Sequence, residues 1–72
     1  MRKITKAIVI GLGSIALRHR RNLKQLFPEV LVIAVPASGK VLNQNIKFSD
    51  KIILTLEEAI KEGVDMAIVA SP

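Results

Sequence analysis

The chain has 72 residues, half of them hydrophobic, and a formal net charge of +5 from eleven basic and six acidic side chains. This length allows one small domain, and the apolar half of the composition predicts a folded globular unit. Cysteine is absent, which excludes disulfides, thiol nucleophiles and thiolate metal sites. No apolar run approaches the roughly 20 residues of a membrane span, and the basic start leads directly into a strand pattern. We therefore expect a cytoplasmic protein without a membrane segment.

The basic excess is compatible with an anionic partner. The two phenylalanines are the only aromatic residues, so the chain lacks a stacking platform for single-stranded nucleic acid. We expect no nucleic-acid partner. As a minor alternative, anion or nucleic-acid binding through Arg18, Arg21 and Lys24 would have to weaken steeply with salt.

The first third of the chain predicts a strand near residues 6–11 and a helix from about Ser14 to Phe27. The apolar, β-branched run from Ala7 to Ile10 favours the strand. Pro28 ends the helix, since the residue before a proline is pushed out of the helical region. The residues expected on the buried face of this helix are Ile15, Ala16, His19, Leu23 and Leu26. Those expected on its solvated face include Arg18, Arg20 and Arg21.

Three further strands and a helix are predicted downstream. The apolar run from Val30 to Val35 reads as a second strand, which completes a right-handed βαβ unit. Residues 41–48 are ambiguous between a short helix and a loop. A short third strand is expected over 52–54, and a fourth over 66–70.

The helix between these last two strands has its own start and stop signals. Thr55, with Glu58 three residues on, forms a capping box, and Gly63 is placed to end the helix. Leu56, Ala59 and Ile60 are expected to form its buried face. The resulting α/β architecture is half of a doubly wound parallel sheet with strand order 3-2-1-4. Because the fourth strand would be an apolar edge, we expect residues 1–72 to be a truncated, partial dinucleotide-binding domain or to pair with a second copy.

The turn after the first strand carries the G-x-G-x-x-G/A pattern of a dinucleotide site. Gly11 can take the tight turn, and Gly13 has no Cβ to hold a phosphate away from the backbone. Ala16 fills the third small position, where helix and strand pack closely. Ser14 is a candidate N-cap that could also donate a hydrogen bond to a pyrophosphate. A plain strand-to-helix turn is the alternative interpretation.

The end of the second strand bears on which dinucleotide binds. In NAD sites a carboxylate at this position usually hydrogen-bonds to the ribose hydroxyls. This chain has no acidic residue between Val35 and Asp50. Ser38 and Lys40 could instead hold a 2′-phosphate, which slightly favours NADP. The alternative is that residues 36–40 are only a turn. Ser71 and Pro72 follow the fourth strand on the crevice side, where ligands bind in open α/β sheets.

Three segments together resemble the Gfo/Idh/MocA oxidoreductases. The run Gly11-Leu12-Gly13-Ser14-Ile15-Ala16, followed by Arg18-His19 and Asn22-Leu23, is similar to that family's amino-terminal motif. Residues 55–60 resemble its D-L-E-E-A-L helix, and residues 65–72 resemble its D-x-V-x-I-A-T-P strand. The last motif glycine is replaced by Ala16, and the expected acid near Ala37 is missing.

The resemblance implies an NAD(P)-dependent oxidoreductase that acts on a sugar, sugar nucleotide or polyol by hydride transfer. The family's catalytic lysine lies beyond residue 72, so the chain alone is expected to be inactive. A non-catalytic Rossmann-like module that self-associates through its edge strand is the alternative, and we expect a homo-oligomer. The resemblance implies dinucleotide contacts at Gly11, Leu12, Gly13, Ser14, Ile15, Ala16, Ala37, Ser38, Ala70, Ser71 and Pro72. The turn after the second strand suggests a further contact at Lys40.

Overall fold

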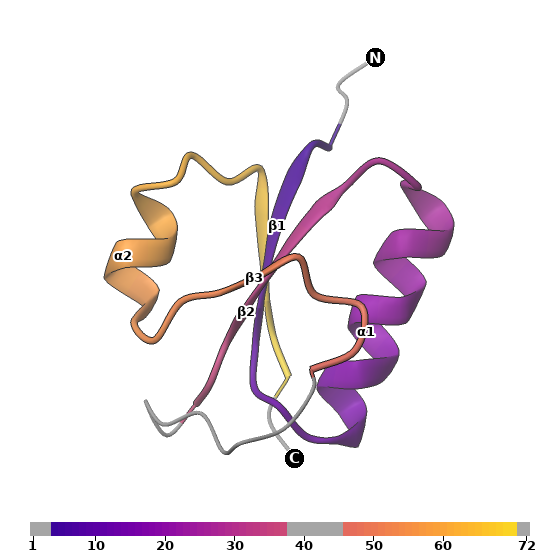
Figure 1. The fold of residues 1–72 in the computed structure, drawn as a ribbon, viewed down its shortest axis with the longest axis horizontal. Coiled ribbons are helices and arrows are strands. Elements are labelled where there is room, and N and C mark those ends of the chain that lie inside the picture. The colour runs from indigo at the N-terminus through magenta and orange to yellow at the C-terminus, as the bar shows by residue number, and fades with distance from the viewer. Residues whose placement is uncertain (1–3, 38–45, 71–72) are drawn as a thin grey trace.

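A computed structural model of the chain describes residues 4–37 and 46–70. These ranges contain four strands and two helices, with one helix between β1 and β2 and one between β3 and β4 (Figure 1). The elements are β1 (Lys6–Ile10), α1 (Ser14–Leu26), β2 (Leu31–Val35), β3 (Lys51–Ile52), α2 (Leu56–Ile60) and β4 (Met66–Val69).

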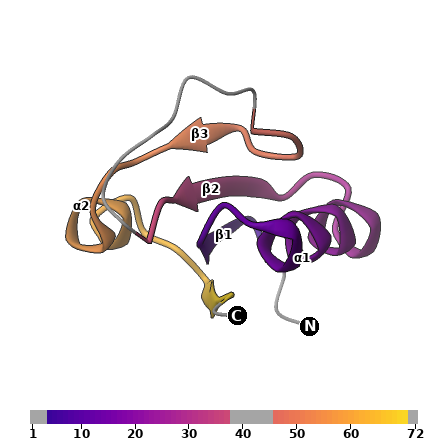
Figure 2. The same ribbon diagram turned by 90° about the horizontal axis from the view of Figure 1, so that it is seen from below.

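The four strands form one parallel sheet in the order β3-β2-β1-β4, as the sequence predicts. In the central pairs, Ile8 lies opposite Ile33 of β2 and opposite Ala67 of β4. β2 and, after Lys6, β1 are continuous apolar runs because both of their faces are covered, one by each helix. Figure 2 shows α1 and α2 on opposite sides of the sheet.

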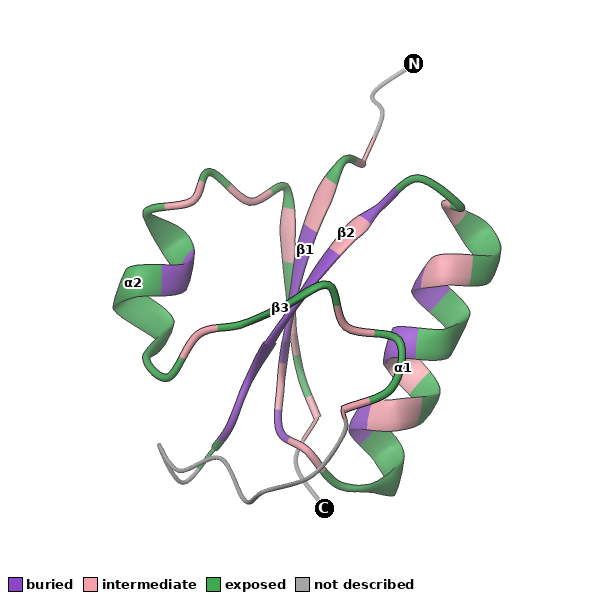
Figure 3. Cartoon of the chain, viewed as in Figure 1, coloured by how far each residue is buried: buried purple, intermediate pink, exposed green. Residues whose placement is uncertain are grey.

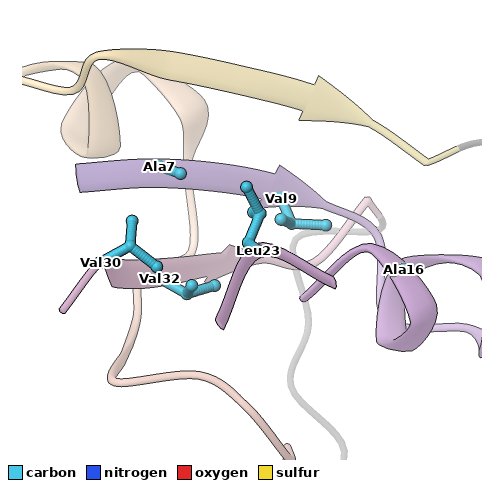
Figure 4. Packing of buried hydrophobic residues seen from close by; sticks show 6 residues of the cluster. All are labelled: Ala7, Val9, Ala16, Leu23, Val30 and Val32. Carbon is cyan, nitrogen blue, oxygen red and sulfur yellow. The ribbon is translucent and has the colours of Figure 1, made fainter. Parts of the chain in front are cut away.

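Alternation along β1 and β2 divides the core into two clusters. On the α1 side, Leu23 packs against Val9 and its neighbours, and Figure 4 shows the six buried members of this cluster. Those members are Ala7, Val9, Ala16, Leu23, Val30 and Val32. The buried members of the cluster on the α2 side are Ile8, Ile33, Val35 and Ala59.

The buried stripe of α1 differs from the predicted one. It runs through Ala16, Arg20 and Leu23, spaced by four and three residues, so Arg20 is inside and the prediction of a solvated Arg20 is wrong. Ile15 is 44% exposed and Leu26 is 72% exposed, so neither belongs to the core. His19 is only partly buried. The predicted stripe lies too far toward Ile15, because the hydropathy pattern assigns Arg20 to the solvent.

The segment leading to α2 differs in detail from expectation. β3 covers Lys51–Ile52 and not 52–54, although the Ile53 amide still donates to the Ala34 carbonyl at 3.1 Å. Residues 46–48 form a turn and not a helix, and Phe48 has a positive φ of 60°. Residues 41–45 lie outside the described ranges.

α2 begins as predicted but buries less than predicted. Thr55 is its N-cap and accepts a hydrogen bond from the Glu58 amide at 3.3 Å. Gly63 follows the helix with a φ of +78°. Only Ala59 is buried, whereas Leu56 is 39% and Ile60 is 55% exposed, because five residues give the helix a single inward position. Figure 3 shows this contrast with the sheet centre.

Two aspartates tie the amino-terminal ends of the strands. Asp65 accepts hydrogen bonds from the Thr5 amide at 2.8 Å and the Lys6 amide at 3.0 Å, which joins the start of β1 to the start of β4. Asp50 accepts from the Val32 amide at 2.8 Å and pairs with Lys24 of α1. Burial alone would raise the pKa of Asp50, but the hydrogen bonds from Lys24 and Val32 and the charge of Lys24 hold it below its usual value.

Among the helices that the described ranges contain, none has both the length and the apolar character that a membrane crossing requires.

Candidate functional site

The turn after β1 is built around Gly11, at the carboxyl end of the central strand. Its φ is +114°, which side-chain-bearing residues rarely adopt. Its amide donates to the Val35 carbonyl at 2.7 Å, and an added Cβ would lie 2.8 Å from the Ala70 carbonyl oxygen. β1, β2 and the end of β4 thus meet at a position that only glycine fits. The predicted tight turn at Gly11 is confirmed.

Ala16 seats the first turn of α1 against this glycine. Its side chain is 1% exposed, and its Cβ lies 3.7 Å from the point where a Gly11 Cβ would stand. A larger residue at position 16 would push the helix away from the strand. The close helix-to-strand approach expected at the third small position of the motif is present.

Gly13 stands in open space at the start of α1. Nothing lies within 4 Å of a Cβ built on Gly13, and its φ of −74° is ordinary. Gly13 is also the N-cap, so Ser14 is the first helical residue and the prediction of Ser14 as N-cap is wrong. The amides of Ser14, Ile15 and Ala16 lie in the first turn, where no intrahelical acceptor precedes them.

A cavity of about 340 Å³ opens over this turn. Ala37, one residue past the buried Pro36 that follows β2, and Ala70, just past β4, complete its wall. The cavity therefore joins the ends of three strands. Ser38, Lys40, Ser71 and Pro72 lie outside the described residues. The lining residues are Gly11, Leu12, Gly13, Ser14, Ile15, Ala16, Ala37 and Ala70, and all eight are predicted contact residues.

The charge around the cavity favours an anion. The first turn of α1 has no acidic residue, and among the described residues no carboxylate lines the cavity. The helix dipole places partial positive charge at the same point. Free amides, a positive helix end and an uncrowded Gly13 together form the kind of surface that binds phosphate groups.

A second cavity of about 300 Å³ borders the same turn, between α1 and the segment that leads to β3. Leu12, Gly13 and Ser14 line both cavities, so the two cavities are neighbours at this turn. Lys47 and the buried Arg20 also line the second cavity.

Arg20 is the residue of this region that sequence reasoning missed. It is 2% exposed; its Nε donates to the Lys47 carbonyl at 2.9 Å, and its Nη1 lies 3.5 Å from the Gly11 carbonyl oxygen. Burial lowers the pKa of Arg20, but a guanidinium remains protonated at neutral pH. The available signal was spacing: Arg20 lies four residues after Ala16 and three before Leu23, on the stripe that faces the sheet.

A third cavity, of about 350 Å³, lies at the other end of α1, around Ile4, Leu26 and Phe27. It shares no lining residue with the cavities at the glycine turn. It contains none of the predicted contact residues.

No protein-family model matches the chain, and comparison with curated proteins and with solved structures gives no match.

Proposed function

We propose that the chain is the dinucleotide-binding segment of an NAD(P)-dependent oxidoreductase whose substrate is a sugar, sugar nucleotide or polyol. The observation that carries the proposal is the cavity over the glycine turn. It combines an open Gly13, first-turn amides without intrahelical acceptors and a wall without carboxylates. The substrate class and the hydride chemistry rest on the resemblance of the three sequence segments to the Gfo/Idh/MocA oxidoreductases.

The residues of the cavity would have separate roles toward the dinucleotide. The amides of Gly13, Ser14 and Ile15 would bind the pyrophosphate, and Ala16 would hold the helix close enough for them to reach it. Ala37 would contact the adenosine side, and Ala70 the side toward β4. The bound nicotinamide would supply hydride transfer. The chain's own contribution is binding and orientation.

The choice between the two dinucleotides follows from the end of β2. An NAD site usually places a carboxylate there, and Ala37 occupies this place at the cavity wall. Ser38 and Lys40, next along the chain, offer a hydroxyl and a cation to a 2′-phosphate. We therefore propose a modest preference for NADPH over NADH.

The test is a fluorescence or calorimetric titration of the chain with NADPH and NADH, repeated on Gly13→Ala. The added methyl group enters open space, so folding stability should fall by less than about 1 kcal/mol. It would stand between the phosphate and the main-chain amides, so affinity should fall about tenfold, equivalent to about 1.4 kcal/mol.

The matched control is Thr55→Ala, which changes the N-cap of the other helix, away from the cavity. It should leave dinucleotide affinity unchanged. Absence of binding by the wild-type chain at millimolar NADPH and NADH, or equal affinity of wild type and Gly13→Ala, would contradict the proposal.

A second candidate is a non-catalytic module that associates through β4. The observation in its favour is that β4 is at an edge of the sheet and that its Val69 side chain is 68% exposed. Unpaired edge strands promote pairing between copies. Sedimentation at several concentrations discriminates: a tight dimer indifferent to NADPH supports this candidate, whereas a monomer stabilised by NADPH supports the dinucleotide site.

A further inference from the structure

Arg20 carries a charge that its packing position does not require. It is 2% exposed on the stripe of α1 that packs against the sheet, between Ala16 and Leu23. Removing a guanidinium from water is costly, and an apolar residue of similar size is often equally stable or more stable at such a position. Arg20 donates to two main-chain carbonyls, those of Lys47 and Gly11. Among the described residues no carboxylate pairs with it, so its positive charge is not neutralised there.

The contact with Gly11 bears on how the glycine turn presents its amides. The carbonyl of Gly11 and the N–H of Leu12 belong to one planar trans peptide and point in opposite directions. A guanidinium that attracts the Gly11 oxygen therefore turns the Leu12 N–H to the other side of the turn. The Gly11 amide and Cα are already fixed by Val35 and Ala70. Arg20 constrains the remaining group of Gly11, its carbonyl oxygen.

The stronger bond of Arg20, to the Lys47 carbonyl at 2.9 Å, joins the helix to the segment before β3. This segment is a turn in which the Ser49 hydroxyl donates to the Ile46 carbonyl at 2.6 Å. The guanidinium thus spans the second cavity between the glycine turn and residues 46–47. Leu12, Gly13 and Ser14 line this cavity and also the cavity that contains the proposed phosphate position.

We infer that Arg20 is a positioning residue of the diphosphate site, which orients the Gly11–Leu12 peptide and adds positive charge behind the glycine turn. The inference rests on the proposed function and deepens it. Because the charge acts on phosphate groups, its removal weakens a diphosphate ligand and spares the same ligand without phosphates. A purely structural role would weaken both equally.

The experiment compares ADP with adenosine on the chain and three variants. In Arg20→Met, ADP affinity is expected to fall about tenfold and adenosine affinity less than about twofold. Arg20→Lys keeps the charge but loses the planar fork, so about a threefold loss for ADP is expected. Arg21→Met removes one charge from the exposed neighbouring position and should change ADP affinity less than about twofold. Circular dichroism and urea unfolding establish which variants are folded.

A second readout is the ¹H–¹⁵N resonance of Leu12, whose shift on adding ADP should be lost in Arg20→Met. Equal ADP affinity in wild type and either folded Arg20 variant overturns the inference, as does an equal loss of ADP and adenosine. If Arg20→Met does not fold, Arg20→Lys decides alone. A wild-type chain that binds neither ADP nor NADPH overturns the proposed function, and this inference with it.

Discussion

The two faces of the sheet are covered to different degrees. On one face α1 has thirteen residues and buries Ala16, Arg20 and Leu23, and the glycine turn with its cavities lies at its start. On the other face α2 has five residues and buries only Ala59. The sheet is therefore covered closely by α1 on one face and sparsely by α2 on the other. The candidate site thus lies where helix and sheet fit closely, and most of the exposed apolar side chains lie elsewhere.

The exposed apolar side chains lie mainly between the start of β3 and the end of α2, and on β4. The large hydrophobic side chains that remain exposed there are Ile52, Leu54, Leu56, Ile60 and Val69. Exposed apolar patches on a small domain mark sites of association. The edge position of β4 places part of this surface where a further strand could pair with it.

Truncating a side chain on each face should give the largest difference. Leu23→Ala removes a 4% exposed residue from the α1 cluster and should lower the free energy of unfolding by about 3 kcal/mol. Ile60→Ala, at a 55% exposed position on α2, should cost less than about 0.5 kcal/mol. Urea unfolding measures both. Equal losses would mean that the α2 face is packed as closely as the α1 face.

Adding a methyl group at a glycine beside each helix gives the next largest effect. Gly11→Ala combines a φ of +114° with a 2.8 Å approach to the Ala70 carbonyl, so a loss of about 2–3 kcal/mol is expected. Gly63→Ala has the strain of a φ of +78° but nothing within 4 Å, and about 1 kcal/mol is expected. Thermal unfolding ranks the two. A Gly63 variant as unstable as the Gly11 variant would refute the close packing at the glycine turn.

A smaller effect is expected from the ion pair between Asp50 and Lys24, which supports the α1 face alone. The native pKa of Asp50 is lowered, so its contribution is present above the unfolded pKa of about 3.9 and is lost as pH falls through the native pKa. Asp50→Asn should cost no more than about 1 kcal/mol at pH 7, because the pair is partly exposed.

The measurement is urea unfolding of wild type and Asp50→Asn between pH 7 and pH 2. Their difference should shrink as the pH falls below about 4, and it should also shrink with added salt at pH 7. A difference that is constant with pH would show that the charge of Asp50 is not what stabilises the contact.

A change of similar size is expected at the start of α2. Thr55→Ala removes the bond from the Glu58 amide, which is 3.3 Å long, so a cost of about 0.5–1 kcal/mol is expected. For a five-residue helix this cap is a large share of its support, and amide exchange in residues 56–60 should rise more than global stability falls. Uniform exchange changes across the sheet would contradict this.

Features set by local chemistry were predictable from the sequence. Gly11 breaks a β-branched run, Thr55 precedes Glu58 by three residues, and four apolar runs in a βαβ rhythm indicate a parallel sheet. The strand order 3-2-1-4 follows from these signals. The eight residues that line the cavity at the glycine turn were named partly from the glycine motif and partly from the family resemblance. Ser14 was misplaced by one position because the open Gly13 already serves as the N-cap.

Features set by tertiary packing were not predictable. The sequence pattern predicts a surface position for Arg20. In the structure Arg20 donates a hydrogen bond to the Lys47 carbonyl, and hydrophobic periodicity cannot predict this partner. The exposure of Ile60 and Leu26 likewise depends on how far each helix reaches along the sheet. The burial of these residues depends on tertiary contacts.

The position of β1 between β2 and β4 has a consequence for how the chain folds. β1 is made first, yet one of its two neighbours, β4, is the last strand in the described ranges, and Thr5 bonds to Asp65 across 60 positions. Closing so long a loop is an entropic cost incurred before any pairing rewards it. The βαβ unit of β1, α1 and β2 is therefore the natural early nucleus, with the docking of β4 as the slow, late event. During synthesis on a ribosome, one flank of the central strand would wait unpaired until β4 emerges.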